Sequence, residues 1–215
     1  MKELEKNIIA LFSENGKRWL SILSGLTAQI AIKYGLTHLK PVKNLSYNYV
    51  LSGFQGSQPV ILKLGLDIDG LKREAFALQA FSGFGVVKVL VENDGMLLLE
   101  RAVSGDSLKS YFSAKDNDAV RITCDCIKRL HQAPIPHDHR LPHIEHWLGV
   151  FDNDSNIPTH YLHKAKKLRD ALIATSSAPV LLHGDLHHDN ILKNGNDWVG
   201  VVGANRRNFR TTIVH

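Results

Sequence analysis

The sequence has no long hydrophobic run and little cysteine. Its longest apolar runs, of about five or six residues, fall far short of the roughly 20 that a membrane-spanning helix needs. The N-terminus is mixed in charge and leads only into the apolar residues 8–12, which are too few for a secretory signal, so we expect a cytoplasmic chain with no membrane partner. The two cysteines, Cys124 and Cys126, lie two positions apart on an expected helix, which disfavours a disulfide between them and a zinc knuckle.

Charge of neither sign is gathered into a long block. The net charge is +5, but the densest basic cluster is only Arg206, Arg207 and Arg210. A modest basic excess of this kind is typical of a protein with a solvated charged surface or of one that binds a small anionic ligand. We therefore expect no nucleic-acid partner. Hydrophobic residues at 44% and charged residues at 22% exclude disorder as the main state. No feature indicates a particular oligomeric state.

The first half of the chain is β-rich behind a helical start. Apolar residues of the first 35 positions form two helical faces, Leu4, Ile8, Leu11 and Phe12 on one and Trp19, Ile22, Leu23 and Leu26 on the other. The patterns that follow predict strands at 47–52 and 59–64 around a hairpin loop at 53–58, a helix at 71–81, and strands at 86–92 and 96–100.

The second half is mainly helical. One helix is expected at 119–131, with Val120, Thr123, Ile127 and Leu130 at helical spacing, and another at 162–175. A short buried strand at 179–182, a polar loop at 183–190 and a short hairpin toward Trp198 complete the pattern.

This order predicts an α+β fold of two lobes. The β-rich lobe comprises residues 1–101 and the helical lobe residues 102–215, with a hinge near residues 100–105. Because ligands usually bind in clefts between lobes, we expect the functional site there.

The segment 181–192 carries the strongest chemical signal. His183, Asp185 and Asn190 follow the spacing H-x-D-x-x-x-x-N. Phosphoryl transfer to a hydroxyl needs a carboxylate that orients the hydroxyl and accepts its proton, and an oxygen ligand for Mg²⁺; Asp185 and Asn190 supply that pair at the spacing of kinase catalytic loops. His183 is placed to brace this catalytic loop by hydrogen bonding. The alternative is a polar surface loop with turn-forming residues.

A lysine and a glutamate upstream fit the same chemistry. Lys63 lies in an otherwise apolar strand, where a buried ammonium group is costly without a partner. Glu74 follows eleven residues later on the next expected helix. Kinases use such a lysine to bind ATP phosphates and such a glutamate to hold the lysine. The alternatives are a lysine that extends to solvent and a Glu74 that pairs with Lys72 or Arg73.

The glycines Gly53 and Gly56 are interpreted as part of a plain hairpin, because they lie between two strands immediately before the lysine strand. We expect the nucleotide loop earlier, near Asn44, Leu45 and Ser46. No G-x-G-x-x-G is present in that loop, which excludes the ordinary protein-kinase signature.

Histidine is abundant, with twelve residues, and five of them lie in one proline-interrupted stretch. We interpret these five as surface or core residues rather than as metal ligands. They are His131, His137, His139, His143 and His146.

The sequence resembles the aminoglycoside/hydroxyurea antibiotic-resistance kinases, the streptomycin 6-kinase type of the aminoglycoside phosphotransferase superfamily. The resemblance extends from about residue 17 to residue 200 and rests on segments 16–20, 45–50, 60–65, 97–101, 104–108 and 181–190. It implies a protein-kinase-like fold with ATP in the cleft between the lobes and an aminoglycoside-like small molecule as acceptor.

The resemblance also implies residue roles. Lys63 would bind the ATP phosphates and Glu74 would hold Lys63. Glu100 to Ala102 would meet the adenine through the backbone. Asp185 would be the catalytic base and Asn190 a ligand of Mg²⁺.

The sequence departs from the family pattern after Trp198. The family continues there into an Ile-Asp-Pro-x-Gly segment whose Asp is the second magnesium ligand, whereas no Asp or Glu follows Asp197 in this chain. Asp197 itself lies about four residues early. We therefore expect a C-terminally truncated or frame-disrupted kinase with impaired transfer. The alternatives are a non-catalytic nucleotide-binding remnant and, less favoured, a metallophosphoesterase that would use Asp185 beside His187 and His188.

Overall fold

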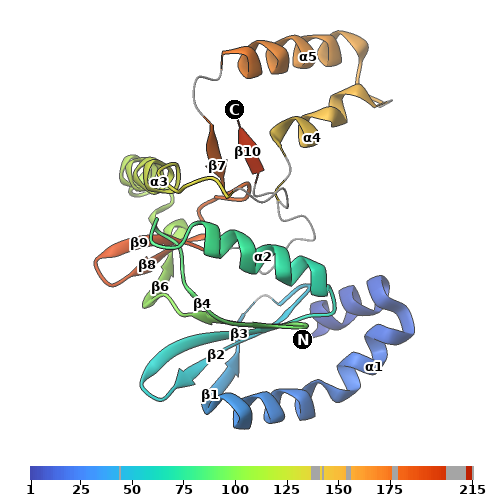
Figure 1. The fold of residues 1–215 in the computed structure, drawn as a ribbon, viewed down its shortest axis with the longest axis vertical. Helices are drawn as coiled ribbons and strands as arrows, with labels where there is room; N and C mark the ends of the chain where they lie inside the picture. The colour runs from blue at the N-terminus through green and yellow to red at the C-terminus, as the bar shows by residue number, and fades with distance from the viewer. Residues whose placement is uncertain are drawn as a thin grey trace.

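The structure is a computed structural model of the 215-residue chain. It describes residues 1–43, 45–136, 141, 143–153, 156–175, 179–201 and 212–214. The N-terminal part is an antiparallel five-stranded sheet with one helix on each face, and the remainder is built from helices and two small sheets (Figure 1).

The large sheet has the strand order β1-β2-β3-β5-β4. Its strands are β1 (Leu36–Pro41), β2 (Tyr49–Gln55), β3 (Gln58–Leu64), β4 (Val89–Asn93) and β5 (Met96–Glu100). Helix α1 (Lys2–Tyr34) covers one face and helix α2 (Ile68–Ala80) lies on the other.

Strand periodicity divides the sheet residues between two cores. Leu62, Leu64 and Leu98 are buried in the cluster that includes residues of α1, whereas Leu97 and Leu99 are buried in the cluster that includes residues of α2. Because successive side chains of a strand point to opposite faces, the residue between Leu62 and Leu64 must face α2. That residue is Lys63, so the pleat of β3 alone directs the lysine toward the helix that carries Glu74.

Helix α1 is bent. Ser13 has non-helical backbone angles inside it, and Gly35 ends it in the left-handed region with φ 63°. Trp19 and Leu23 are buried as expected, but Ile22 is 57% exposed. The expected face was one residue too wide, because Ile22 lies at the edge of the stripe that Trp19 and Leu23 define.

The hairpin between β2 and β3 is tighter than the sequence pattern predicted. Strand β2 continues to Gln55 and β3 starts at Gln58, so Gly56 and Ser57 alone form the turn, and the expected six-residue loop is wrong. Gly56 has φ +59°, a conformation that favours glycine. Gly53 is a strand residue, and a Cβ there would lie 2.6 Å from Leu39 of β1. The edge strand β1 itself was not expected.

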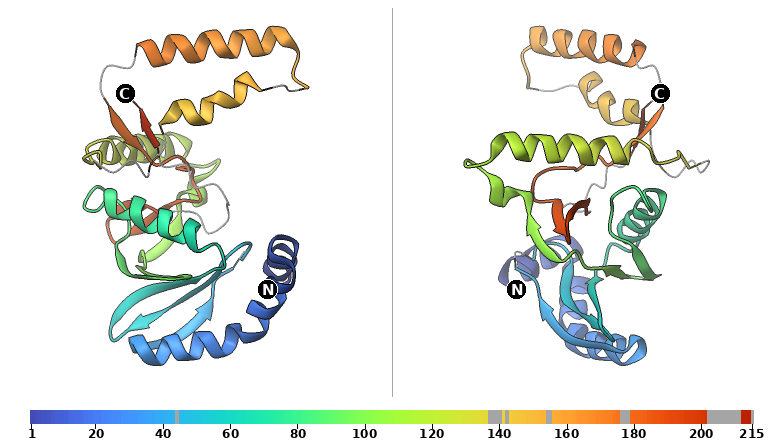
Figure 2. Two further views of the ribbon diagram at one scale, coloured as in Figure 1. Left: turned by 45° about the vertical axis from the view of Figure 1, so that its right-hand side comes forward. Right: turned by 90° about the vertical axis from the view of Figure 1, so that its left-hand side faces the viewer.

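The C-terminal part contains two longer helices, α3 and α5, and several short elements. They are β6 (Ser104–Ser107), the 3-10 helix η1 (Leu108–Tyr111), α3 (Asp116–Leu130), α4 (Ile144–Leu148), the 3-10 helix η2 (Gly149–Asp152), α5 (Thr159–Ala174), β7 (Val180–Leu182), β8 (Ile191–Asn194), β9 (Asp197–Gly200) and β10 (Thr212–Val214). Strands β6, β8 and β9 form one sheet, and β7 pairs with β10. Helices α4 and α5 lie at the end of the molecule away from the large sheet (Figure 2).

Helix α3 buries only part of the expected face, because Leu130 is buried and Thr123 is half-buried but the other two members are not. Val120 is 63% exposed and Ile127 is also exposed, whereas Cys126 and Leu130 are buried. The helix turns Cys126 and the half-buried Ile122 toward Trp198 of β9, so the tertiary partner, not the most apolar stripe, determines which face is covered.

No helix among the described residues is both long and apolar enough to cross a membrane.

Replacing Leu98 with alanine tests the core of the large sheet. Leu98 is fully buried, so the substitution should lower the free energy of unfolding by about 2–5 kcal/mol through lost burial and a residual cavity. Urea denaturation measures the change. Ile32→Ala on α1, where Ile32 is 84% exposed, is the control and should change stability by no more than about 0.5 kcal/mol. Equal effects of the two substitutions would contradict this packing.

Candidate active site

The central feature of the candidate site is a buried ion pair between β3 and α2. Lys63 and Glu74 are 3% and 5% exposed, and Lys63 Nζ donates a hydrogen bond to Glu74 Oε2. Burial raises the pKa of Glu74, while the positive charge of Lys63 and its hydrogen bond act to lower it. The lysine does not extend to solvent, and Lys72 pairs with Asp94 at 2.8 Å instead of with Glu74. Both alternatives considered for these residues are therefore excluded.

Helix α2 begins in a way that positions Glu74. Asp67 caps it, because the Asp67 side chain accepts a hydrogen bond from Gly70 N–H at 2.9 Å. Leu71, Ala75 and Leu78 are buried on the same side of the helix as Glu74. The apolar stripe thus carries the carboxylate into the core, where it forms its ion pair with Lys63.

The polar loop between β7 and β8 brings Asp185 and Asn190 together. Asn190 is buried, and its Nδ2 donates to the main-chain oxygen of Asp185 at 2.8 Å and to Asp185 Oδ2 at 3.2 Å. The main-chain N–H of Asn190 donates to the carbonyl of His187 at 2.8 Å. Because the amide nitrogen is used inside the loop, Asn190 Oδ1 is the atom that a cation could use.

His183 lies beneath this loop. It is buried, and its Nδ1 accepts a hydrogen bond from Asp185 N–H at 3.4 Å. Its ring lies 6.2 Å from the ring of Phe81, the residue that follows α2. Burial lowers the pKa of His183 to about 4, against a smaller raising effect of the Asp185 charge. A neutral imidazole that accepts from the loop is suited to bracing Asp185.

His187 is the other titratable neighbour of Asp185. Its Nε2 lies 3.9 Å from Asp185 Oδ2 and its Nδ1 lies 3.8 Å from Asp189 Oδ2. Asp189 also contacts Lys109, whose Nζ lies 3.4 Å from Asp189 Oδ1. The carboxylate of Asp185, whose side chain is 19% exposed, thus lies beside partly exposed groups and remains accessible to a ligand.

The expected hinge residues lie where β5 leaves the large sheet. Glu100 N–H donates to Lys88 O at 2.9 Å and Arg101 N–H donates to Pro59 O at 3.2 Å. Both amides are therefore used within the sheet. Ala102, which is buried, and the carbonyls of this segment are the backbone groups to consider for an adenine.

The expected nucleotide loop lies between β1 and β2. Asn44 is outside the described residues, Leu45 is buried, and the carbonyl of Ser46 accepts a hydrogen bond from the Asn7 side chain of α1 at 3.0 Å. Gly53 and Gly56 belong to the neighbouring hairpin, which confirms that they do not form this loop.

Metal-binding groups are sparse in the described part of the chain. No cluster of three or more His, Cys, Asp and Glu residues suited to a metal is found there. In the histidine-rich stretch, His143 accepts a hydrogen bond from Glu145 N–H at the start of α4, and His137 and His139 lie outside the described residues. The donors present beside each other are Asn190 Oδ1 and the Asp185 carboxylate, which fit a cation held mainly by phosphate oxygens.

Asp197 is engaged elsewhere. It is the first residue of β9, not a residue before the strand as expected, and its carboxylate pairs with Arg129 of α3. Ile191, next to Asn190, pairs with Gly200, three residues further along β9. At about 3.3 Å per strand residue, Asp197 is about 10 Å along β9 from Gly200, the residue opposite Ile191. The family pattern has its second Asp about four residues after Asp197, and residues 202–211 lie outside the described part of the chain.

Comparison with known proteins identifies the family. A model of the aminoglycoside/hydroxyurea antibiotic resistance kinases matches residues 40–206. The chain belongs to this family. It is 31% identical over 162 residues to a streptomycin 3''-kinase of Klebsiella pneumoniae, and the match covers 72% of this chain and 58% of that relative. The chain thus matches less than two thirds of the length of this kinase.

Solved structures of other phosphotransferases and kinases share the fold. A ternary complex of a thermostable aminoglycoside phosphotransferase APH(4)-Ia mutant with ADP and hygromycin B has a TM-score of 0.63 at 11% identity, with 87% of this chain and 72% of that chain covered. A choline/ethanolamine kinase family protein from Mesorhizobium loti has a TM-score of 0.58 at 18% identity, with 87% and 66% covered. The expected α+β, protein-kinase-like fold is confirmed.

The pairing of Lys63 with Glu74 predicts a specific pH dependence. In Lys63→Met the buried Glu74 loses its cation, so its pKa in the folded state should lie well above the unfolded value. Such a group destabilises the fold increasingly as pH rises, so we expect a loss of about 3–5 kcal/mol near pH 8 and a smaller one near pH 5. Chemical denaturation across this range provides the measurement. The double variant Lys63→Met/Glu74→Leu should recover most of the loss and have no such slope; a persistent slope would contradict the assignment.

The burial of His183 predicts a second pH dependence, of opposite direction. Its folded-state pKa of about 4 lies below the ordinary histidine value of 6.5, so between these values the unfolded chain binds a proton that the folded chain does not. Stability should therefore fall by up to about 3 kcal/mol as pH drops through this window. The unfolding free energy of His183→Gln should decrease less between pH 6.5 and pH 4 than that of the wild type. Parallel curves would show that His183 is not the group responsible.

Proposed function

We propose that this chain binds ATP with Mg²⁺ between its two lobes and descends from kinases that transfer the γ-phosphate to a hydroxyl of an aminoglycoside-like small molecule. The observation that carries the proposal is that α2 contacts both halves of the site. Its Glu74 pairs with Lys63, and Phe81, which follows the helix, packs against His183 beneath the loop of Asp185 and Asn190. The family and the streptomycin kinase relative support this class of acceptor.

Each residue has a role that its contacts suit. Glu74 fixes the ammonium group of Lys63 so that its remaining N–H donors can bind phosphate oxygens. Asp185, held by Asn190 and by the bond from its own N–H to His183, would orient the acceptor hydroxyl and accept its proton. Ser46 and the backbone of Glu100 to Ala102 would contact the nucleotide.

Magnesium would be held through Asn190 Oδ1 and the phosphate oxygens. The ion neutralises charge on the β- and γ-phosphates when it is bound. In this chain, residues 198–215 contain no Asp or Glu, so the second carboxylate ligand of the family pattern has no counterpart there. We therefore propose that phosphate transfer is impaired while nucleotide binding is retained.

The second candidate function follows from the missing second carboxylate ligand. A chain that binds nucleotide without transferring phosphate would be a pseudokinase-like binding protein. The lack of an acidic residue after Asp197 favours it, and the two candidates differ in turnover alone.

Returning a carboxylate at residue 202 separates these two functions. Wild-type protein should be stabilised against heat by Mg-ATP, with phosphate transfer to streptomycin at least about 100-fold slower than in Val202→Asp, because one well-placed charged ligand supplies several kcal/mol in the transition state. Calorimetry and a coupled ADP-release assay measure binding and transfer.

Val202→Asn, of the same size without the charge, is the matched control and should remain as slow as the wild type. Rapid phosphate transfer by the wild-type chain would contradict the proposal that transfer is impaired. An absence of Mg-ATP binding, with the protein folded, would overturn the proposed function itself.

A further inference from the structure

The end of α2 is bound to the second lobe by a short strap, residues 81–87. Within the strap, Gly85 O accepts a hydrogen bond from Gly200 N–H at 2.7 Å, and Val87 N–H donates to Gly200 O at 3.3 Å. Val86 and Gly200 form a parallel bridge. The last residue of β9 is therefore held by the strap on both of its backbone polar groups.

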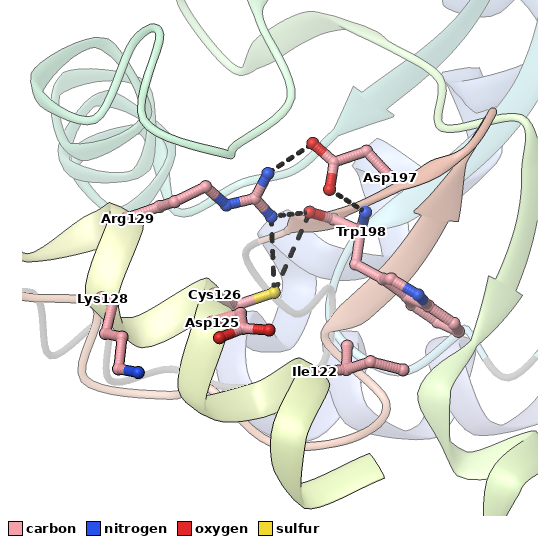
Figure 3. A pocket seen from close by; sticks show the side chains of 7 residues that line it. All are labelled: Ile122, Asp125, Cys126, Lys128, Arg129, Asp197 and Trp198. Atoms are coloured by element: carbon pink, nitrogen blue, oxygen red, sulfur yellow. Dashed lines mark hydrogen bonds and ion pairs between the residues drawn. The ribbon is translucent and has the colours of Figure 1, made fainter. Parts of the chain in front are cut away.

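Arg129 of α3 holds β9 and lies against the same strap. Its guanidinium group donates to the Asp197 carboxylate and to Trp198 O, and lies 3.6 Å from Cys126 Sγ (Figure 3). A Cβ at Gly85 would come within 3.3 Å of Arg129 Nε. Gly85 also has φ +90°, so both its backbone angles and the arginine favour glycine at this point.

A cavity of about 370 Å³ opens beside the guanidinium group, with Asp125 and Lys128 on its wall. The arginine is already bonded to Asp197 and Trp198, so its hydrogen-bonding capacity is directed to β9. This arrangement fits a brace between elements better than a receptor for a ligand in the cavity.

Both ends of the braced region reach the candidate active site. Phe81 begins the strap, is 1% exposed, and packs against His183. Beyond Gly200, Val201 N–H donates to Asn190 O at 2.9 Å. At its Phe81 end, the strap is continuous with α2, the helix that carries Glu74. Arg129 therefore lies at the junction between the Lys63–Glu74 pair and the Asp185–Asn190 loop.

We propose that Arg129 is a positioning residue that fixes α2, and with it the Lys63–Glu74 pair, relative to the catalytic loop. The proposal rests on the proposed function for its effect on nucleotide binding, because that effect requires Lys63 to contact the phosphates. Arg129 touches no reacting group itself; it acts through Gly85 and β9.

Arg169 provides a matched control with the same chemistry elsewhere in the lobe. It donates to Asp152 at 2.6 Å, to Asp170 at 2.8 Å and to Leu148 O at 3.4 Å. Like Arg129, it links a helix to a carboxylate and a main-chain carbonyl of another segment. Its partners belong to α4, η2 and α5, which lie away from α2 and the strap (Figures 1 and 2).

The test compares Arg129→Met with Arg169→Met in the full chain. Affinity for the Mg²⁺ complex of a non-hydrolysable ATP analogue is measured by calorimetry, also in a Glu74→Gln background. Arg129→Met should weaken binding about five- to tenfold and Arg169→Met less than about twofold. In the Glu74→Gln background Arg129→Met should add less than about twofold, because sites that act through one element are not additive whereas distant independent sites are.

Hydrogen exchange supplies a readout that needs no nucleotide. Arg129→Met should accelerate exchange in α2 and in residues 183–190, and Arg169→Met should do so only around α5. Arg129→Lys, which keeps the charge but not the paired contacts with Asp197 and Trp198 O, should reproduce the pattern if Arg129→Met fails to fold. Unchanged exchange in α2, or the same fold-loss of affinity in both backgrounds, would overturn the proposal. If the wild type binds no nucleotide but the exchange pattern holds, the proposed function fails and the positioning role stands.

Discussion

The arrangement of the first lobe depends on one ion pair taken out of water. Removing two charges from solvent costs several kcal/mol each, and only a close, fixed partner offsets that cost. Lys63 and Glu74 meet this condition because the pleat of β3 and the buried stripe of α2 direct them toward each other. A rotation of α2 that separated them would expose or orphan both charges. The pair therefore fixes the helix against the sheet more strictly than apolar packing would.

That constraint extends into the second lobe because the two lobes share a core. The cluster around α2 includes Leu97 of the large sheet as well as Leu130 of α3, Leu181 of β7 and Val199 of β9. Packing of this kind leaves few voids and transmits displacements. The chain leaves the large sheet after Glu100, but the hydrophobic core is not divided there. The candidate site thus lies on one packed body whose two halves adjust together.

The parts of the site that the sequence predicts are those whose residues lie close together in the chain or within one strand. Asp185 and Asn190 are five residues apart in one loop, and the position of Lys63 follows from an alternation within a single strand. The unpredicted parts depend on partners distant in sequence. Arg129 and Asp197 are 68 residues apart, and nothing in the local pattern of either indicates the other.

The same distinction explains the errors in the fold. Val120 and Ile127 form the more apolar stripe of α3, yet Cys126 faces Trp198 because the β8–β9 hairpin lies on that side. The predicted loop between β2 and β3 is too long because Gly53, which the pattern assigns to the turn, is a strand residue. In the structure its missing side chain serves close contact with β1 instead. Both errors arise where a tertiary neighbour, absent from any local window, overrides the local pattern.

Binding and transfer place different demands on this site. Binding needs groups that exist before the reaction, and under the proposed function the ammonium group of Lys63 and the backbone near Ala102 would be such groups. Transfer needs a cation held in one place while charge moves between oxygens. A neutral amide such as that of Asn190 holds Mg²⁺ less firmly than a carboxylate, so the phosphates themselves would have to locate the ion. An ion that is held only by the phosphate being transferred would stabilise the transition state less than an ion that the protein holds in place. A chain with an intact Lys63–Glu74 pair and no second carboxylate would therefore lose transfer before it lost affinity.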